Sequence, residues 1–572
     1  MRWQLREADE GEVGRLAAEA ALPLPLAGIL ARRGIATAAA ARVFLDPRIS
    51  DLHNPLLMDD MEKATMRLRR AKERGESVLL FGDYDVDGIT STAAMGRVLE
   101  SLGLRYAFCH PDRGKEGYGF NARGVREAIA QGASLIITLD CGTEAAGPIA
   151  EARRAGLDVI VIDHHIPKGD LPPATAVVNP KKERCLYPFK ELAAAGVVLK
   201  FARALVEAVP VRLPWGELLQ LAALGTVADV APLREENRII TILGLEAMNR
   251  APLPGIEALA RAADCDPGEV RARHLAFQLG PRLNAAGRVG TPADATGLLL
   301  ESDYGKCRPI AHELSRLNAQ RQAIEKKITE EALAQVERSG AMEKGKVLVV
   351  AGAGWHPGVI GIVAARIMER YYRPTVVIAL GEETGHGSAR GIPGFDLFGG
   401  LSLCRDLFSS FGGHRHAAGL TIPLRNIEPF RARFTAAAEE LLSEEDLIPA
   451  VSIDFVLPIE GVGPDLLGLL GRLEPFGAGN PRPVFASRGL RIAGKPRLMG
   501  SRSSHLKFHL LPPAGNAGPF ECVGWNMAYR LPELAGGGPL DIAYVPRRGE
   551  WNGIARMELI LKDFRPSGSL SE

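Results

Sequence analysis

The stretch Val78-Leu79-Leu80-Phe81-Gly82-Asp83-Tyr84-Asp85-Val86-Asp87-Gly88 joins a short apolar run directly to three alternating carboxylates. A continuous apolar run bounded by a turn is typical of a central strand that is buried on both faces of a parallel sheet. Similar runs occupy residues 135–139 and 159–162, with helical stretches between them. This alternation predicts a doubly wound α/β domain.

Each of the three predicted strands is followed at once by side chains that can bind a metal ion. The carboxyl ends of parallel strands meet at one edge of a sheet, where open α/β sheets bind ligands. Crowded carboxylates are unfavourable without a cation, so the pattern predicts a site for a hard divalent ion. The residues are Asp83, Asp85 and Asp87 after the first strand, Asp140 after the second, and Asp163, His164 and His165 after the third.

The ligand types narrow the choice of metal. Carboxylates and imidazoles together suit Mn²⁺ or Mg²⁺ better than an ion that prefers thiolates. Asp229, within the apolar segment 225–232, adds a further acid, because a buried charge usually needs a partner or a metal. A carboxylate that bridges two ions about 3.5–4 Å apart would give the arrangement used for phosphoryl transfer.

Alternatives remain open for the single motifs. The acids after the first strand could form a solvated surface cluster without a metal. A calcium-binding loop could also begin this way, but Ile89-Thr-Ser-Thr-Ala starts a helix and no acid stands at the last ligand position. An Asp after a strand, or Asp229 itself, could be a helix cap. The convergence of three strands at one edge favours the metal site.

The spacing of apolar residues and the Gly and Pro content divide the remaining sequence into further parts. Leu314, Leu317, Ile324 and Ile328 roughly follow helical spacing and predict a long connecting helix. β-rich sequence with Gly and Pro punctuation follows Ser443 and predicts a small barrel or sandwich. The expected parts are a helical N-terminal lead-in (1–60), the first α/β domain (61–250), a helical connector (251–340), a second α/β domain (341–445), the barrel (446–565) and a frayed tail (566–572).

The composition excludes several classes of protein. The chain has 572 residues, of which 24% are charged, and its net charge of +1 excludes a uniformly basic surface but allows a local basic groove. Seven cysteines without a CxxC pair indicate neither a zinc ribbon nor a disulfide framework. The chain shows no apolar signal core and no apolar run of the roughly 18 residues that a membrane span needs. We therefore expect a cytoplasmic protein that does not associate with membranes.

A local basic excess lies between Pro481 and Leu510, a segment without any acid. Barrels of the OB type bind single strands through basic grooves and aromatic side chains, and Phe485, Phe508 and Trp525 lie in or near this segment. The alternative is a solvated face over core aromatics. The basic residues are Arg482, Arg488, Arg491, Lys495, Arg497, Arg502 and Lys507.

The ordered segments GDYDVDG, TLDCG, IDHH and GTVADVAPL resemble motifs one to four of the DHH phosphoesterase superfamily. Pyrophosphatases of this superfamily have a histidine four residues before Asp85, where this chain has Phe81. The additional Asp83 instead resembles the RecJ exonucleases. Further segments extend that resemblance to roughly residues 60–565, namely 280–288, 355–361, 387–391, 411–419 and a C-terminal region similar to the RecJ OB-fold.

The resemblance implies a catalytic centre with two Mn²⁺ or Mg²⁺ ions. Asp140 would bridge the ions and act in catalysis with His164 and His165, and Asp163 would orient a neighbouring histidine. The implied metal-site residues are Asp83, Asp85, Asp87, Asp140, His164, His165 and Asp229.

The resemblance also implies a substrate-binding surface. Arg113, Ser388 and Arg390 together would form a pocket for a 5′-phosphate. Two polar loops, at 387–391 and 411–416, would contribute to it, and the glycines of the second would let backbone N–H groups approach an anion. The other implied substrate-binding residues are Tyr118, Asn284, Arg288, Gly412, Gly413 and His414.

The implied function is 5′-to-3′ exonuclease action on single-stranded DNA in repair and recombination. Hydrolysis by two metal ions would release 5′-mononucleotides, and the protein would be a monomer with a helicase and a single-strand-binding protein as expected partners. One alternative is a DHH hydrolase of very short oligonucleotides or cyclic-dinucleotide products, which the basic C-terminal segment disfavours. Another is a non-catalytic scaffold that binds single strands, which the complete set of metal-site residues disfavours.

Overall fold

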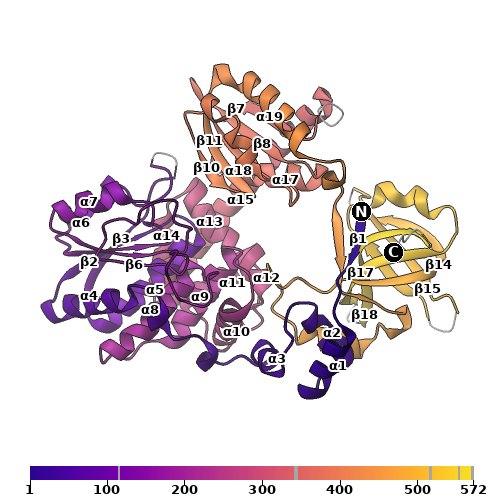
Figure 1. Ribbon diagram of the computed structural model, residues 1–572, viewed down its shortest axis with the longest axis horizontal. Coiled ribbons are helices and arrows are strands. Elements are labelled where there is room, and N and C mark those ends of the chain that lie inside the picture. The colour runs from indigo at the N-terminus through magenta and orange to yellow at the C-terminus, as the bar shows by residue number, and fades with distance from the viewer. Residues whose placement is uncertain (114–115, 341–344, 501, 515–517, 552–553, 569–572) are drawn as a thin grey trace. The chain divides into compact units, whose positions relative to one another are not determined.

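The computed structural model describes residues 1–113, 116–340, 345–500, 502–514, 518–551 and 554–568. The chain forms two compact units (Figure 1). One consists of residues 48–447 with 477–479, and the other consists of residues 1–47, 448–476 and 480–572. Residues 569–572 of the expected tail lie outside the described residues.

The first α/β domain is built on a five-stranded sheet in the order β3-β2-β4-β5-β6, with every strand parallel to its neighbours. β2, β4 and β5 coincide with the three predicted apolar runs, and they are buried almost throughout. Their carboxyl ends therefore share one edge of the sheet. The strands are β2 (Ser77–Gly82), β3 (Arg105–Cys109), β4 (Leu135–Leu139), β5 (Asp158–Ile162) and β6 (Ala176–Val178).

Helices cover both faces of this sheet, as the sequence predicted (Figure 1). α6 and α7 pack on one face through a core that includes Leu79, Ile136 and Ile149. α4, α5, α8 and α9 pack together on the opposite face. The helices are α4 (Met61–Arg74), α5 (Val86–Leu102), α6 (Ala122–Ala130), α7 (Ala146–Arg154), α8 (Ala194–Ala208), α9 (Trp215–Ala228) and α10 (Glu235–Arg250).

A helical connector follows this domain. The long helix predicted from the spacing of Leu314, Leu317 and Ile328 is α15, which runs for 36 residues. Its C-terminal half packs against the second α/β domain through Ile328, Ala332 and Val336. The helices of the connector are α11 (Pro254–Arg261), α12 (Ala272–His274), α13 (Gly280–Val289), α14 (Pro292–Leu300) and α15 (Tyr304–Ser339).

The second α/β domain has a mixed sheet in the order β10-β11-β9-β8-β7, in which only β7 and β8 are parallel. Its strands are β7 (Leu348–Ala353), β8 (Thr375–Leu380), β9 (Thr384–Arg390), β10 (Ser410–His414) and β11 (Ala417–Pro423). Its helices are α17 (Ile360–Tyr371), α18 (Leu397–Ser402) and α19 (Ile427–Leu441).

The two loops predicted in this domain are mostly wrong, because the larger part of each segment lies in a strand and only Gly391 and the turn at 415–416 lie outside. Residues 387–390 belong to β9, and residues 412–414 belong to β10, which forms a hairpin with β11. Their glycines suggested loops because glycine is depleted in strands. Here the glycines allow close pairing instead: a Cβ on Gly413, whose φ is +150°, would lie 2.4 Å from the carbonyl oxygen of Ala417. The residues concerned are Gly387, Ser388, Arg390, Gly412, Gly413 and His414.

The other unit contains the predicted barrel. Its strands pair in the order β13-β14-β15-β16-β18-β17, and a further β14–β17 pairing closes the barrel. The strands are β13 (Phe455–Val456), β14 (Phe485–Met499), β15 (His505–Leu511), β16 (Phe520–Gly524), β17 (Leu540–Trp551) and β18 (Ile554–Pro566), and one helix, α20 (Pro464–Gly471), precedes β14.

The N-terminal segment is more than the expected helical lead-in. β1 (Arg2–Leu5) pairs in parallel with β12 (Ala450–Ile453), so the first 47 residues belong to the barrel unit. Leu16, Leu26 and Leu30 pack into the core of the barrel. Local sequence could not reveal a pairing between segments so far apart along the chain. The helices of this segment are α1 (Glu10–Glu19), α2 (Leu24–Ala31) and α3 (Ala38–Leu45).

The described part of the chain contains no single helix with the length and hydropathy to cross a membrane, and only the bent pair α1 and α2, at 119° to each other, meets these criteria jointly.

Candidate metal centre

The loop after β2 is shaped by its own carboxylates. The side chain of Asp85 caps α5 by accepting hydrogen bonds from the backbone N–H groups of Asp87 (3.0 Å) and Gly88 (3.2 Å). Gly88 is required because a Cβ at this position would lie 2.4 Å from the carbonyl oxygen of Asp83. The tight turn holds Asp83 and Asp87 inside the protein, where each is 1% exposed.

The structure brings the predicted metal-site side chains together. Their possible ligand atoms form three groups, within each of which all atoms lie within 4.8 Å of one another. Asp140 belongs to two groups and His164 to two. The groups are Asp83 with Asp85 and Asp140; Asp140 with His164 and His165; and Asp87 with His164 and Asp229.

Buried polar atoms without partners test whether a metal fits this cluster. The Oδ1 atoms of Asp83 and Asp140 and the Nε2 atom of His164 are buried and have no hydrogen-bond partner among the described residues. Buried polar atoms are normally paired, and leaving one unpaired destabilises the fold. All three atoms are good ligands for a divalent cation, so the residues fit a metal centre.

The electrostatics of the cluster also favour a bound metal ion. Burial, together with repulsion by Asp85 and other acids, raises the pKa of Asp140 well above its ordinary value. Burial and Asp85 also raise the pKa of Asp87 to about 7. Burial and the neighbouring His165 lower the pKa of His164 to about 3, so its ring is neutral. A bound cation would relieve this repulsion between acids.

Asp163 has a different environment from the other acids. It accepts hydrogen bonds from the backbone N–H groups of Thr143 (3.0 Å), His164 (2.7 Å) and His165 (3.1 Å) and from Nδ1–H of His165 (2.7 Å). Burial opposes its ionisation, but these bonds outweigh burial and hold its pKa below the ordinary range. Its oxygens are occupied, which suits a residue that orients His165 and does not bind the metal itself.

Asp87 has a second role that sequence reasoning missed. Its Oδ2 and Oδ1 atoms accept hydrogen bonds from the N–H groups of Ala194 (2.6 Å) and Ala195 (2.9 Å), at the start of α8. α8 has no side-chain cap of its own, so Asp87 caps it from a distant part of the chain.

His110 is a further residue for which the sequence gave no role. It follows β3 at the same sheet edge, and its Nδ1 atom lies 3.0 Å from the carbonyl oxygen of Gly82 and 2.9 Å from that of Asp83. Its Nε2 atom lies 2.8 Å from the hydroxyl of Thr296 on α14. Burial lowers the pKa of His110 to about 4, so a neutral ring fixes the backbone of the metal loop. Its position directly after a strand was the sequence signal that could have placed His110 at this edge of the sheet.

Next to the cluster lies a cleft of ≈1130 Å³ between the first α/β domain, α13 and the second α/β domain. Arg113, Tyr118, Arg288, Ser388, Arg390 and Gly412 line it. Asn284, Gly413 and His414 do not. Gly114 and Lys115, which directly follow Arg113 in the sequence, lie outside the described residues.

The cleft concentrates positive charge. Burial and the proximity of Arg113 lower the pKa of Arg390, and the same causes together with Arg321 lower the pKa of Arg288 to about 10. Arg390 donates to the hydroxyl oxygen of Ser388 (3.3 Å). Gly361, in the first turn of α17, leaves room for both side chains, because its Cβ would lie 3.0 Å from Ser388 Oγ. Arginines held close to one another in this way favour an anionic ligand.

α13 joins the metal loop to the far wall of the cleft. A Cβ on Gly287 would lie 2.4 Å from the carbonyl oxygen of Tyr84, which lies between two of the acids. Arg288, the next residue, donates to the carbonyl oxygen of Gly358 at 2.7 Å. Tyr118 adds a contact on the other side, since its hydroxyl donates to the carbonyl oxygen of Asp140 at 2.9 Å.

The basic segment of the barrel unit is only partly as expected. Arg482, Arg488, Arg491, Lys495, Arg497 and Arg502 are exposed, whereas Lys507 is half-buried and pairs with Glu521 (2.8 Å). Phe485 and Phe508 are buried in the barrel core, so neither is a stacking platform. Trp525 is 45% exposed and Tyr529 78% exposed, and these two rings remain accessible.

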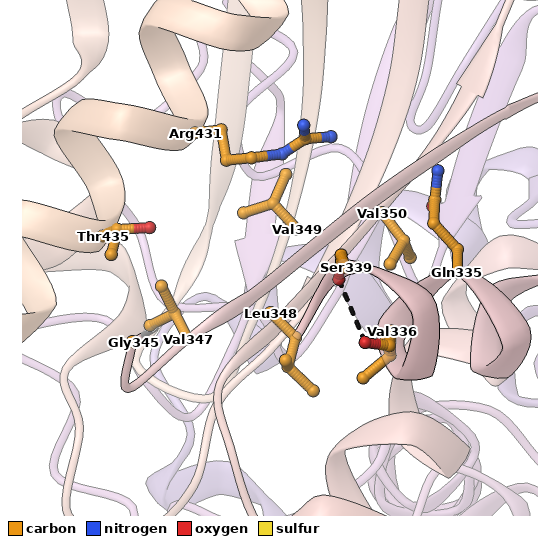
Figure 2. Close-up of a pocket in the computed structure, with 10 residues that line it drawn as sticks. All are labelled: Gln335, Val336, Ser339, Gly345, Val347, Leu348, Val349, Val350, Arg431 and Thr435. Atoms are coloured by element: carbon orange, nitrogen blue, oxygen red, sulfur yellow. Dashed lines mark hydrogen bonds between the residues drawn. The ribbon is translucent and has the colours of Figure 1, made fainter. Parts of the chain in front are cut away.

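A separate cavity of ≈350 Å³ lies in the second α/β domain, among the end of α15, β7 and α19 (Figure 2). Half of its lining residues are aliphatic. Arg431 is the one ionisable side chain among its described lining residues, and it pairs with Glu428 at 2.8 Å. Ser339 donates to the carbonyl oxygen of Val336, as Figure 2 shows. No catalytic group reaches this cavity from the described residues that line it.

Three family models match the chain. The DHH family N-terminal domain matches residues 77–226, the DHHA1 domain matches residues 344–442, and the RecJ OB domain matches residues 453–563.

Whole-length relatives agree with the family models. The chain is 39% identical to the single-stranded-DNA-specific exonuclease RecJ of Bacillus subtilis over 98% of this chain and 70% of that protein. The crystal structure of RecJ from Thermus thermophilus in complex with Mn²⁺ matches this chain with a TM-score of 0.85 and 30% sequence identity. The match covers 100% of this chain and 80% of that one. The same protein in complex with Mg²⁺ gives a TM-score of 0.79. This chain belongs to the RecJ family of single-stranded-DNA-specific exonucleases.

Proposed function

We propose that this chain removes nucleotides one at a time from the 5′ end of single-stranded DNA and releases 5′-mononucleotides. Its family gives the substrate class and the reaction, which is metal-dependent hydrolysis of phosphodiesters. The observation that carries the finer proposal is the cleft, which places an arginine-rich wall next to a cluster of buried, unpartnered metal ligands.

The three side-chain groups support a division of ligands between two ions. Asp83, Asp85 and Asp140 would hold one ion, and Asp87, His164 and Asp229 the other. Asp140 would be the bridge, because its Oδ1 atom also lies 3.2 Å from Nε2 of His164. His165 would complete the centre beside Asp140, in the orientation that Asp163 sets. When bound, two such ions activate water and neutralise charge at the scissile phosphate.

The arginine-rich wall of the cleft suits a terminal phosphate. A 5′-phosphate has more charge and more free oxygens than an internal diester, and arginine forks bind such groups in a bidentate manner. Arg113 and Arg390 would bind the phosphate with the hydroxyl of Ser388. Tyr118, Asn284, Arg288, Gly412, Gly413 and His414 are the further proposed contacts of the strand.

The cellular setting is also a proposal. We expect a cytoplasmic monomer that does not associate with membranes and that acts in repair and recombination with a helicase and a single-strand-binding protein. We keep residues 61–250, 251–340, 341–445 and 446–565 as the proposed domain limits, and residues 1–47 go with the barrel because β1 pairs with β12.

This function is tested by comparing the digestion of two single-stranded substrates, a 60-mer labelled at either end and a 3-mer. We expect Mn²⁺-dependent release of mononucleotides from the 5′ end of the 60-mer and no reaction in excess chelator. Preference for the 3-mer would favour the short-oligonucleotide hydrolase, and binding of the 60-mer without cleavage would favour the scaffold.

A further inference from the structure

Four helices of the first α/β domain end in the same turn. In each, two successive backbone N–H groups bond back into the last turn of the helix, and the first of them belongs to a residue in the left-handed conformation. Glycine occupies that position in all four because it has no Cβ to clash there. The residues are Gly75 after α4, Gly103 after α5, Gly132 after α6 and Gly156 after α7, with φ between +63° and +80°.

α9 ends in the same turn with valine in place of glycine. The N–H of Val230 bonds to the carbonyl of Val227 (3.3 Å), and that of Ala231 bonds to the carbonyl of Thr226 (3.2 Å). The φ of Val230 is +60°. A β-branched residue in this conformation is strained, and such strain is concentrated at functional sites.

Packing does not compensate for the strain at Val230. Its side chain is 68% exposed, so it contributes little to the core. It directly follows Asp229, whose Oδ2 atom lies 3.9 Å from Nε2 of His164 in the metal centre. Ile166, which directly follows His165, is also 68% exposed. Aliphatic side chains therefore reach solvent at two places next to residues of the metal centre.

The chemistry of the substrate suggests what such a side chain contacts. Charged side chains of the cleft would bind the phosphates, but the bases of a single strand also have apolar faces that an aliphatic side chain can contact. We infer that the side chain of Val230 packs against the face of the nucleobase next to the phosphate held at the metal centre. This contact tolerates any base, and it needs an unstacked base, which a duplex does not offer. The inference rests on the proposed function.

The variant Val230→Gly and a matched control test the role of the side chain. Asp264 follows α11 in the same turn, with φ +53°, a bond from its N–H to the carbonyl of Arg261 (3.2 Å) and an exposed side chain. Unlike Val230, which directly follows Asp229, Asp264 does not follow a residue of the metal groups. Glycine at either position removes strain, so both variants should keep or raise the Tm. Only Val230→Gly should lower kcat/KM on a 5′-phosphorylated strand, by about tenfold, as expected when the buried area of one aliphatic side chain is lost.

A modified substrate distinguishes two explanations of a slower Val230→Gly variant: a lost contact with the base, or a displaced Asp229. In a strand whose two 5′-terminal nucleotides lack their bases, wild type and Val230→Gly should react at the same rate, and both should need the same Mn²⁺ concentration for half-maximal activity. Equal slowing of intact and abasic strands, a shifted Mn²⁺ requirement, or no slowing at all would overturn the inference. Failure of the proposed function would look different, because wild type would then not digest the intact strand from its 5′ end.

Discussion

The Nε2 atom of His164 lies 3.2 Å from the Oδ1 atom of Asp140, with no hydrogen-bond partner for either among the described residues. The backbone of Leu192 hydrogen-bonds the same imidazole, which leaves Nε2 as the unprotonated nitrogen of a neutral ring. When Asp140 is ionised, two acceptors therefore face each other inside the protein. Such a pair needs a proton or a cation between its members, and a divalent ion would replace the proton that the raised pKa of Asp140 retains.

The first prediction follows from this pair. Asp140→Asn should lower the rate on single-stranded DNA by about three orders of magnitude or more, because a two-ion centre loses the carboxylate that joins its ions. Without metal, the variant should melt at a higher temperature than wild type near pH 8, because an amide cannot ionise and adds no charge to the acidic cluster. Added Mn²⁺ should raise the Tm of wild type but not that of the variant.

Asp170→Asn is the control, since Asp170 is an exposed acid of the same domain outside the three groups. It should behave as wild type in both assays. An Asp140→Asn protein that keeps a tenth of the activity would remove Asp140 from the centre.

The second prediction concerns pH. Burial and Asp85 raise the pKa of Asp87 to about 7 from its ordinary value of 3.8. Because the folded-state pKa is the higher one, its contribution to stability is complete below the ordinary value and is lost as the pH rises through about 7. Mn²⁺ needs ionised carboxylates, so its stabilising effect should grow over the same range.

Thermal melts of wild type with and without Mn²⁺ measure this directly. The increase in Tm caused by the ion should be small near pH 5 and larger near pH 8, on the order of several degrees. A stabilising effect that is constant over this range would contradict the raised pKa values.

The third prediction concerns truncation. Removing residues 448–572 alone should expose Leu16, Leu26 and Leu30, because these side chains pack into the barrel core. That protein should aggregate, whereas residues 48–447 should stay soluble, cleave short strands and bind long strands weakly. Binding by the full chain should fall steeply with salt, since the exposed arginines release counterions when they neutralise phosphates. If residues 48–447 and the full chain bound a long strand with equal affinity, the barrel would have no part in binding.

Sequence predicted the clustering of the candidate metal-site side chains for a simple reason. In a parallel sheet, an apolar run followed by an acid fixes both the strand and the edge to which the acid belongs, so Asp83, Asp140 and His164 could be brought together without a structure. Each prediction needed only local sequence and one topological rule.

The missed features depend on contacts between distant parts of the chain. Asp87 caps a helix that begins at Ala194, and β1 pairs with β12; neither relationship leaves a local pattern. Gly413 looked like a loop residue because a glycine that lets strands approach closely and a glycine in a turn are the same in sequence. Phe508 was counted beside basic residues, but alternation along β15 turns its ring into the core.

The last prediction concerns the end of the strand. Arg390 lies beside Ser388 in the cleft, and burial and the nearby Arg113 lower its pKa. The two arginines therefore repel each other until an anion binds between them. A 5′-phosphate would supply that anion, whereas a 5′-hydroxyl would not. Arg390→Ala should therefore lower kcat/KM by about a hundredfold on a 5′-phosphorylated strand and far less on the 5′-hydroxyl strand.

Arg425→Ala is the matched control, because Arg425 is an exposed arginine of the same domain that does not line the cleft. Its rates on both strands should equal those of wild type. The two strands should be otherwise identical and labelled at the 3′ end, so that every product reports digestion from the 5′ end. If Arg390→Ala slows both strands by the same factor, the arginine binds the backbone and not the end. If wild type prefers the 3′ end, the proposed polarity is wrong even though the metal centre could still be correct.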